Sequence, residues 1–88
     1  MFRKKVSVVT KFGGNMEIMW DILASIYFRK CTDEELRQRD FLKKISHYGI
    51  DVCLSHLMAK GFIRINKKGE YVATSNAKKV LSEKGYFD

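Results

Sequence analysis

The stretch KKISHYGIDVCLSHLMAKGFI, residues 43–63, carries the clearest helical pattern in the chain and decides the fold. Its apolar residues recur at the spacing of a one-faced helix: Ile50, Cys53, Leu54, Leu57 and Met58. Gly61, directly after this run, predicts the end of the helix, and Lys60 is favourable in its last turn. The start is less obvious, because Gly49 lies inside the stretch and glycine destabilises a helix interior.

Two starts are compatible with Gly49. A helix that begins after this glycine is capped by Asp51 and has about 9 residues, or about 14 Å. A helix capped by Ser46 has about 14 residues and a length of about 21 Å. Serine is a preferred N-cap, and glycine costs only about 0.5–1 kcal/mol relative to alanine inside a helix. We therefore predict a helix over about residues 46–60, with Gly49 in its first turn.

Upstream of this helix the sequence predicts two more helices and a strand. Residues 15–29 place many apolar side chains at helical spacing after Asn15, a good N-cap, so this helix is either deeply buried or partly an oligomer interface. Thr32-Asp33-Glu34-Glu35 fits a capping box and predicts a second helix over about 33–43. Residues 5–12 are rich in β-branched side chains and predict a short extra strand in a basic N-terminal arm.

Downstream the sequence predicts a β-hairpin and a short helix. Residues 62–74 alternate in side-chain character on both sides of the basic loop 66–70, which is typical of a hairpin. Thr74 or Ser75 caps a helix that ends at Gly85. We therefore expect one α+β, mostly helical domain over the whole chain. Three helices, a two-stranded wing and a short C-terminal helix form the winged helix-turn-helix arrangement.

The formal net charge of +7 favours a polyanionic partner such as DNA, RNA or an anionic membrane surface. The longest uncharged apolar run of the first helix, Ile22 to Phe28, is far shorter than the roughly 20 residues of a membrane span. We expect a cytoplasmic protein with no membrane contact, whose Cys31 and Cys53 stay reduced. A disulfide stays open as an alternative if the source is a hyperthermophile.

The segment LSHLMAKGFIRINKKGEYVATSNAKKVL, residues 54–81, resembles winged-helix transcription regulators, including the multiple-antibiotic-resistance type. The positions that match their pattern are Leu54, Leu57, Lys60, Gly61, Phe62, Ile63, Tyr71, Thr74 and Leu81. Ala73 and Ala77 depart from the usual leucine and glycine, but both are apolar and small enough to be compatible with the fold. Over about residues 15–85 the chain is most similar to small archaeal winged-helix proteins, among them basic chromatin-type proteins and short regulators of archaeal viruses and plasmids.

This resemblance implies a homodimer that binds double-stranded DNA, associated with the nucleoid or, if viral, located in the host cytoplasm. The recognition helix of these proteins opens with a serine about fifteen residues before the Lys-Gly stop, the place of Ser46 here. Apolar surface on the first helix, the N-terminal strand or the Tyr86-Phe87 tail would form the dimer. That tail otherwise folds back onto the core.

With the helix starting at Ser46, a polar face lies opposite the apolar stripe. We predict that it contacts base edges or phosphates through Ser46, His47, Tyr48, Asp51, Val52 and Ser55. Asp51 is the exception, because a carboxylate repels phosphate. It either accepts from a cytosine amino group, or faces solvent or pairs with a neighbouring lysine, and we favour the second reading.

Basic residues on two other elements are predicted to contact the DNA backbone or an adjacent minor groove. On the second helix and after it they are Arg37, Arg39, Lys43 and Lys44. On the wing they are Arg64, Lys67 and Lys68. Each one alone is explained by a solvated surface charge, and only the set as a whole favours DNA.

Enzyme activity is not expected, because the sequence has neither a phosphate-cradling glycine motif nor a helical His-Glu-x-x-His. Four potential metal ligands, Cys31, His47, Cys53 and His56, depart from structural-zinc spacings, so no metal or other cofactor is expected. No small-molecule ligand can be inferred. The sequence favours a DNA-binding transcription regulator. Two alternatives stay open: a non-specific chromatin-type protein, and a winged-helix adaptor for an acidic protein, which Asp51 favours.

Overall fold

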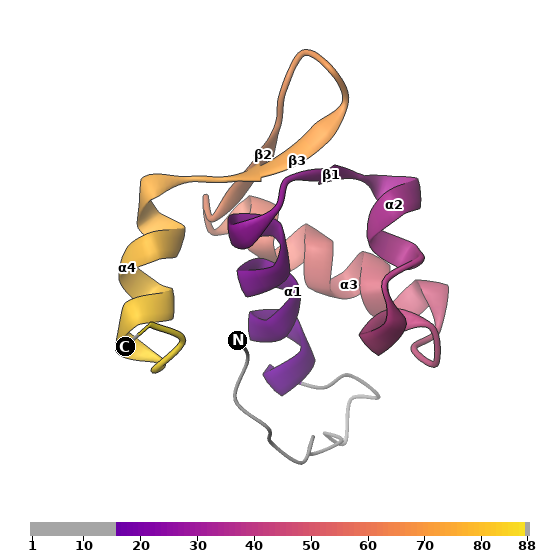
Figure 1. Cartoon of the computed structure of the whole chain (residues 1–88), viewed down its shortest axis with the longest axis horizontal. Helices are drawn as coiled ribbons and strands as arrows, with labels where there is room; N and C mark the ends of the chain where they lie inside the picture. Colours follow the sequence, from indigo (N-terminus) through magenta and orange to yellow (C-terminus); the bar gives the residue numbers. More distant parts are fainter. Residues whose placement is uncertain (1–15, 88) are drawn as a thin grey trace.

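Four α-helices and a three-stranded antiparallel sheet make up residues 16–87, the part of the chain that the computed structural model describes (Figure 1). In chain order the elements are α1 (Met16–Phe28), β1 (Cys31–Thr32), α2 (Asp33–Arg37), the 3₁₀ helix η1 (Asp40–Leu42), α3 (His47–Ala59), β2 (Ile63–Ile65), β3 (Glu70–Ala73) and α4 (Ser75–Glu83). The prediction of an α+β, mostly helical fold is confirmed. The predicted strand over 5–12 and the predicted cap Asn15 lie outside the described residues.

Helix α3 begins where its N-cap serine predicts. The Ser46 hydroxyl accepts a hydrogen bond from the backbone N–H of Gly49 over 3.0 Å, so Gly49 is an early helical residue. A Cβ at Gly49 would lie 3.2 Å from Ser46 Oγ and 3.3 Å from Ile45 Cγ2, which is closer than most Cβ contacts. Glycine, which has no Cβ, avoids this crowding. At the other end Gly61 has a φ of +77°, and the next backbone N–H, of Phe62, bonds back to the Leu57 carbonyl over 2.9 Å.

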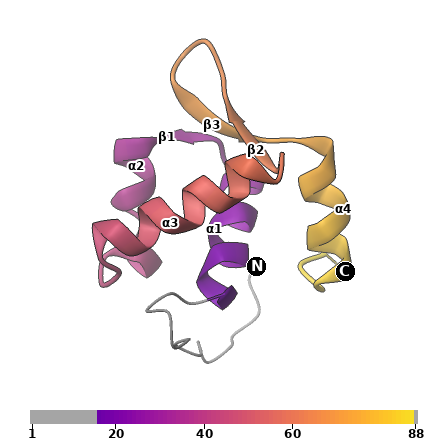
Figure 2. The ribbon, with the colours of Figure 1, turned by 180° about the vertical axis from the view of Figure 1, so that it is seen from behind.

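Helix α1 is the centre of the core. It contacts α3, β3 and α4, and both views of the ribbon show it between α3 and α4 (Figures 1 and 2). Ile22, Leu23 and Ala24 are completely buried. Of the two readings of its wide apolar stripe, deep burial is therefore confirmed for most of the helix, and the exposed aromatic at its end is Phe28.

Helix α2 starts as predicted but is shorter. The capping box is present, with the Glu35 N–H bonded to Thr32 Oγ1 at 3.2 Å and the Thr32 N–H to Glu35 Oε1 at 2.9 Å. The prediction of one helix over 33–43 is wrong, because α2 ends at Arg37 and η1 follows separately. Leu36 and Leu42 are both fully buried, and in a continuous helix their six-residue spacing would place them about 120° apart around the axis. The break lets both face the core.

The sheet has the order β1-β3-β2, with both pairs antiparallel. The predicted hairpin is confirmed, with Ile63 opposite Ala73 and Ile65 opposite Tyr71, and its loop extends beyond the helices (Figure 1). The sequence did not predict β1, which pairs Cys31 with Tyr71, because a two-residue strand is too short to show alternation. Strand β1 joins the hairpin to the start of α2.

The C-terminal segment packs against the rest of the chain. Thr74 occupies the N-cap position of α4, as expected, but its hydroxyl donates to the Gly61 carbonyl over 2.6 Å. After α4 the Tyr86 hydroxyl bonds to the carboxylate of Asp21, and the Phe87 ring meets that of Tyr27 edge to face at a centroid distance of 5.4 Å. The reading in which this tail folds back onto the core is confirmed.

Two further observations concern the cysteines and the lengths of the helices. Cys31 and Cys53 are buried free thiols, as expected for Cys53 from its place on the apolar stripe. Burial raises the pKa of both thiols. Within residues 16–87, no helix combines the length and the apolar character needed to cross a membrane.

Candidate nucleic-acid interface

The residues predicted on the outer face of α3 lie there. Helix α3 crosses the face of the molecule seen in Figure 2, and its inward side is buried through Ile50, Cys53, Leu54 and Leu57. The predicted contact residues are all at least partly exposed: Ser46, His47, Tyr48, Asp51, Val52 and Ser55. Tyr48 is the most prominent, with 77% of its surface exposed. Exposure leaves this face free to meet a partner.

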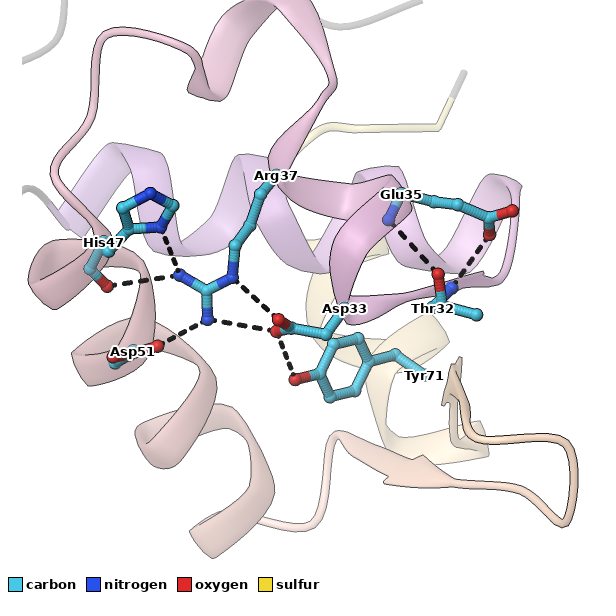
Figure 3. A network of polar contacts seen from close by, with 7 residues as sticks. All are labelled: Thr32, Asp33, Glu35, Arg37, His47, Asp51 and Tyr71. Atoms are coloured by element: carbon cyan, nitrogen blue, oxygen red, sulfur yellow. Dashed lines mark hydrogen bonds and ion pairs between the residues drawn. The ribbon is translucent and has the colours of Figure 1, made fainter.

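Arg37 of α2 donates every N–H of its guanidinium to a few neighbouring groups (Figure 3). Nε and Nη2 donate to the two carboxylate oxygens of Asp33 over 2.9 and 3.0 Å. Nη2 also donates to Asp51 Oδ1 over 2.5 Å. Nη1 lies 3.2 Å from Nδ1 and 3.4 Å from the backbone carbonyl oxygen of His47. Since a guanidinium has five N–H donors, these contacts occupy all of them.

The network around Arg37 also reaches the sheet. Its hydrogen bonds hold the pKa of the Asp33 carboxyl below its ordinary value, and a 2.8 Å hydrogen bond from the Tyr71 hydroxyl acts in the same direction. Burial raises the pKa of Tyr71 to about 12, and the bond to Asp33 contributes to this shift. The bond to Asp33 raises the pKa of Arg37. Helix α2, the N-terminal half of α3 and strand β3 are thereby held together.

Two of the predicted DNA-binding cations have internal partners. Arg37 has only 15% of its side chain exposed and has no donor left for a phosphate. Arg39 donates to the Ser25 carbonyl and to the Arg29 carbonyl, both at 2.9 Å, and also to the Ser25 hydroxyl. Asp51 pairs with a cation, as the favoured reading held, but the cation is Arg37 rather than a lysine.

The other predicted cations are exposed. Lys43 and Lys44 lie in the turn between η1 and α3 rather than on the second helix, and Lys43 is 3.7 Å from the carboxylate of Asp40. Arg64, Lys67 and Lys68 lie on the hairpin and have no ion pair among residues 16–87. Lys43 and Lys44 therefore lie just before the first turn of α3, and the cations of the hairpin form a second exposed basic group.

The hairpin loop is ordered by its own side chains. Asn66 Oδ1 accepts from the backbone N–H groups of Lys68 and Glu70, both over 2.9 Å, and its Nδ2 donates to Glu70 Oε1 over 3.0 Å. Glu70 also lies 4.0 Å from Lys30 Nζ. The acidic residue of the hairpin is thus engaged at its base, while Lys67 and Lys68 remain at the tip.

The contacts of Arg37 with Asp33, His47 and Asp51 were not predicted from the sequence. Their one visible signal is the spacing of Asp33 and Arg37, four residues apart, which places an ion pair on one face of a helix. The partners His47 and Asp51 lie on a different helix, and nothing in their spacing to Arg37 predicts a contact.

No metal site is formed by the candidate ligands in the described part of the chain. Across residues 16–87, no three side chains of His, Cys, Asp or Glu converge in a way that could hold an ion. The four ligands considered from the sequence, Cys31, His47, Cys53 and His56, therefore do not form a cluster.

Comparison with known proteins returns no relative. No protein-family model, curated protein or solved structure matches this chain.

Proposed function

We propose that this chain is a winged-helix DNA-binding protein that regulates transcription. Helix α3 enters the major groove, and the β2-β3 hairpin, the wing, contacts the flanking backbone or minor groove. The observation that carries the proposal is the exposed outer face of α3 beside a wing whose cations Arg64, Lys67 and Lys68 lack ion-pair partners within residues 16–87. Uncompensated cations next to an exposed helix are suited to a polyanion.

The N-terminal end of α3 supports phosphate contact. Ser46, His47 and Tyr48 are exposed in the first turn, where the backbone N–H groups and the helix dipole favour an anion. Lys43 and Lys44 immediately precede this turn and are exposed. In the proposed complex these residues fix the position of α3 in the groove, and residues further along the helix contact bases.

The two alternative functions have weaker support. The adaptor reading depended on an acidic residue at the contact face, and Asp51 pairs there with Arg37, which it shares with Asp33. The chromatin-type reading keeps the same interface and differs only in specificity. It predicts equal affinity for random and for selected DNA sequences.

A homodimer remains part of the proposal. Most of α1 and the Tyr86-Phe87 segment already pack within the chain, so the exposed aromatic surface left on α1 is Phe28, 53% exposed. Light scattering after size-exclusion chromatography is expected to give a mass twice that of the single chain, which is 10.3 kDa. A mass of one chain at micromolar concentration, free and bound to DNA, would remove the dimer from the proposal.

The test of DNA binding is a salt titration of the affinity for duplex DNA, followed by fluorescence anisotropy. Each phosphate contact contributes roughly −0.9 to the slope of log affinity against log salt concentration. Replacing both Lys67 and Lys68 by alanine is expected to reduce the magnitude of that slope by roughly 2.

The matched control removes the same charge elsewhere. Lys78 and Lys79 are exposed on α4, at the side of the molecule opposite α2 (Figures 1 and 2). Their double alanine variant is expected to keep the slope. Undetectable binding at low salt, or equal effects of the two double variants, would contradict the proposal.

A further inference from the structure

Asp51 is an exposed carboxylate with one oxygen engaged and one open. Its Oδ1 accepts from Arg37, and 60% of the side chain is exposed. No donor among residues 16–87 contacts its Oδ2. The contact face of α3 therefore offers a hydrogen-bond acceptor whose orientation is set by a neighbouring helix.

Arg37 makes this acceptor rigid and compatible with DNA. All its donors are engaged, so a rotation of the guanidinium would break hydrogen bonds to Asp33, His47 and Asp51. Because arginine only donates, His47 Nδ1 must accept, and its ring is fixed together with Asp51. The positive charge of Arg37, which Asp51 shares with Asp33, offsets part of the repulsion between the Asp51 carboxylate and DNA phosphates.

The chemistry of the major groove selects the base. A carboxylate only accepts hydrogen bonds, and the donors in this groove are the cytosine N4 and adenine N6 amino groups. Adenine presents its N7 acceptor beside N6 and repels a second acceptor, whereas cytosine presents only the donor.

We infer that Asp51 determines sequence specificity by accepting a hydrogen bond at Oδ2 from a cytosine amino group, with Arg37 as its positioning residue. This inference rests on the proposed function, since α3 must lie in the major groove. Pairing with a cation and contact with cytosine were alternatives for Asp51 in the sequence. In this proposal the same carboxylate does both, with Arg37 as the cation.

Selection of bound duplexes from a random pool tests the role of Asp51. The wild-type chain is expected to select a motif with cytosine at one position of each half-site, and replacing that cytosine weakens binding roughly tenfold. Asp51→Ala is expected to lose the base preference at that position alone. Asp51→Asn keeps an oxygen that accepts from Arg37 but places an N–H donor at the open position, so it is also expected to lose the preference for cytosine.

The outcomes separate this inference from the proposed function. A wild-type chain that selects a motif, together with an Asp51→Ala variant that selects the same motif at every position, would overturn the inference and leave DNA binding intact. A wild-type chain that binds no DNA at low salt would overturn both.

Arg37→Lys tests the positioning role. Lysine keeps the charge but cannot bridge Asp33, His47 and Asp51 at once. We expect the roughly tenfold preference for cytosine over the other bases to fall to about twofold. A purely structural role of Arg37 would weaken binding to all sequences equally, so an unchanged ratio between cytosine and the other bases would overturn the assignment.

Discussion

Single side chains set the geometry of the α3 face. The Ser46 hydroxyl fixes where the helix starts, and that start brings His47 and Tyr48 into its first turn. The sequence predicted this correctly, since capping is local and depends on residues a few positions apart. The cluster around Arg37 was beyond prediction, because its members come from α2, α3 and β3 and meet only in the folded chain.

Removal of the α3 cap is expected to destabilise the protein. Ser46→Ala leaves the Gly49 N–H without its 3.0 Å acceptor and costs about 1 kcal/mol of unfolding free energy. Ser55→Ala, on the exposed face of the same helix, is the control and is expected to stay within about 0.5 kcal/mol of wild type. Urea unfolding followed by circular dichroism measures both. Equal stabilities of the two variants would contradict the capping role.

The lowered pKa of Asp33 predicts a loss of stability in acid. A carboxyl whose pKa is lower in the folded than in the unfolded chain stabilises the fold above its unfolded pKa, here the ordinary value of 3.8. The contribution disappears as the pH falls through the lower, folded value. Wild type is therefore expected to be more stable than Asp33→Asn at pH 7, with the difference shrinking below about pH 4. Thermal unfolding from pH 7 to pH 2.5 measures this, and a constant difference would contradict it.

At the scale of elements, the helices that carry their own signals were predicted and the connections were not. Helices α1, α3 and α4 have apolar stripes that the sequence displays, α3 also has its Ser46 cap, and the hairpin has a loop rich in turn-forming residues. Helix α2 kept its predicted start, but its end depends on packing, because Leu36 and Leu42 must both reach the core. Arg39, at the break, bonds to carbonyls at the end of α1, a contact between residues ten or more positions apart.

Arg39 is therefore expected to be a residue of the fold rather than of the DNA interface. Arg39→Ala removes the donor to the Arg29 carbonyl and to the Ser25 hydroxyl, while the Ser25 carbonyl keeps only the Arg29 N–H, and is expected to cost about 1–3 kcal/mol of unfolding free energy. The control, Lys44→Ala, removes an exposed cation and should change stability by less than about 0.5 kcal/mol. The opposite order of stabilities in chemical denaturation would contradict this assignment.

At the scale of the whole molecule, α3 and the wing project from a core built around α1. Figure 2 shows α3 across one face and the hairpin loop extending beyond the helices, with α4 at the side opposite α2. The sequence predicted the order of these elements, and its net charge is +7. It did not predict which cations remain available, because Arg37 and Arg39 are taken up by contacts that only the fold creates. The charge proposed to meet DNA is consequently concentrated on Lys43, Lys44 and the wing.

An NMR titration of the ¹⁵N-labelled chain with duplex DNA shows whether DNA binds across α3 and the wing. Backbone amide shifts are expected to change over residues 46–55 and 64–69, while those of α4, residues 75–83, stay in place. Changes confined to α4, or no change at low salt with excess DNA, would contradict this expectation.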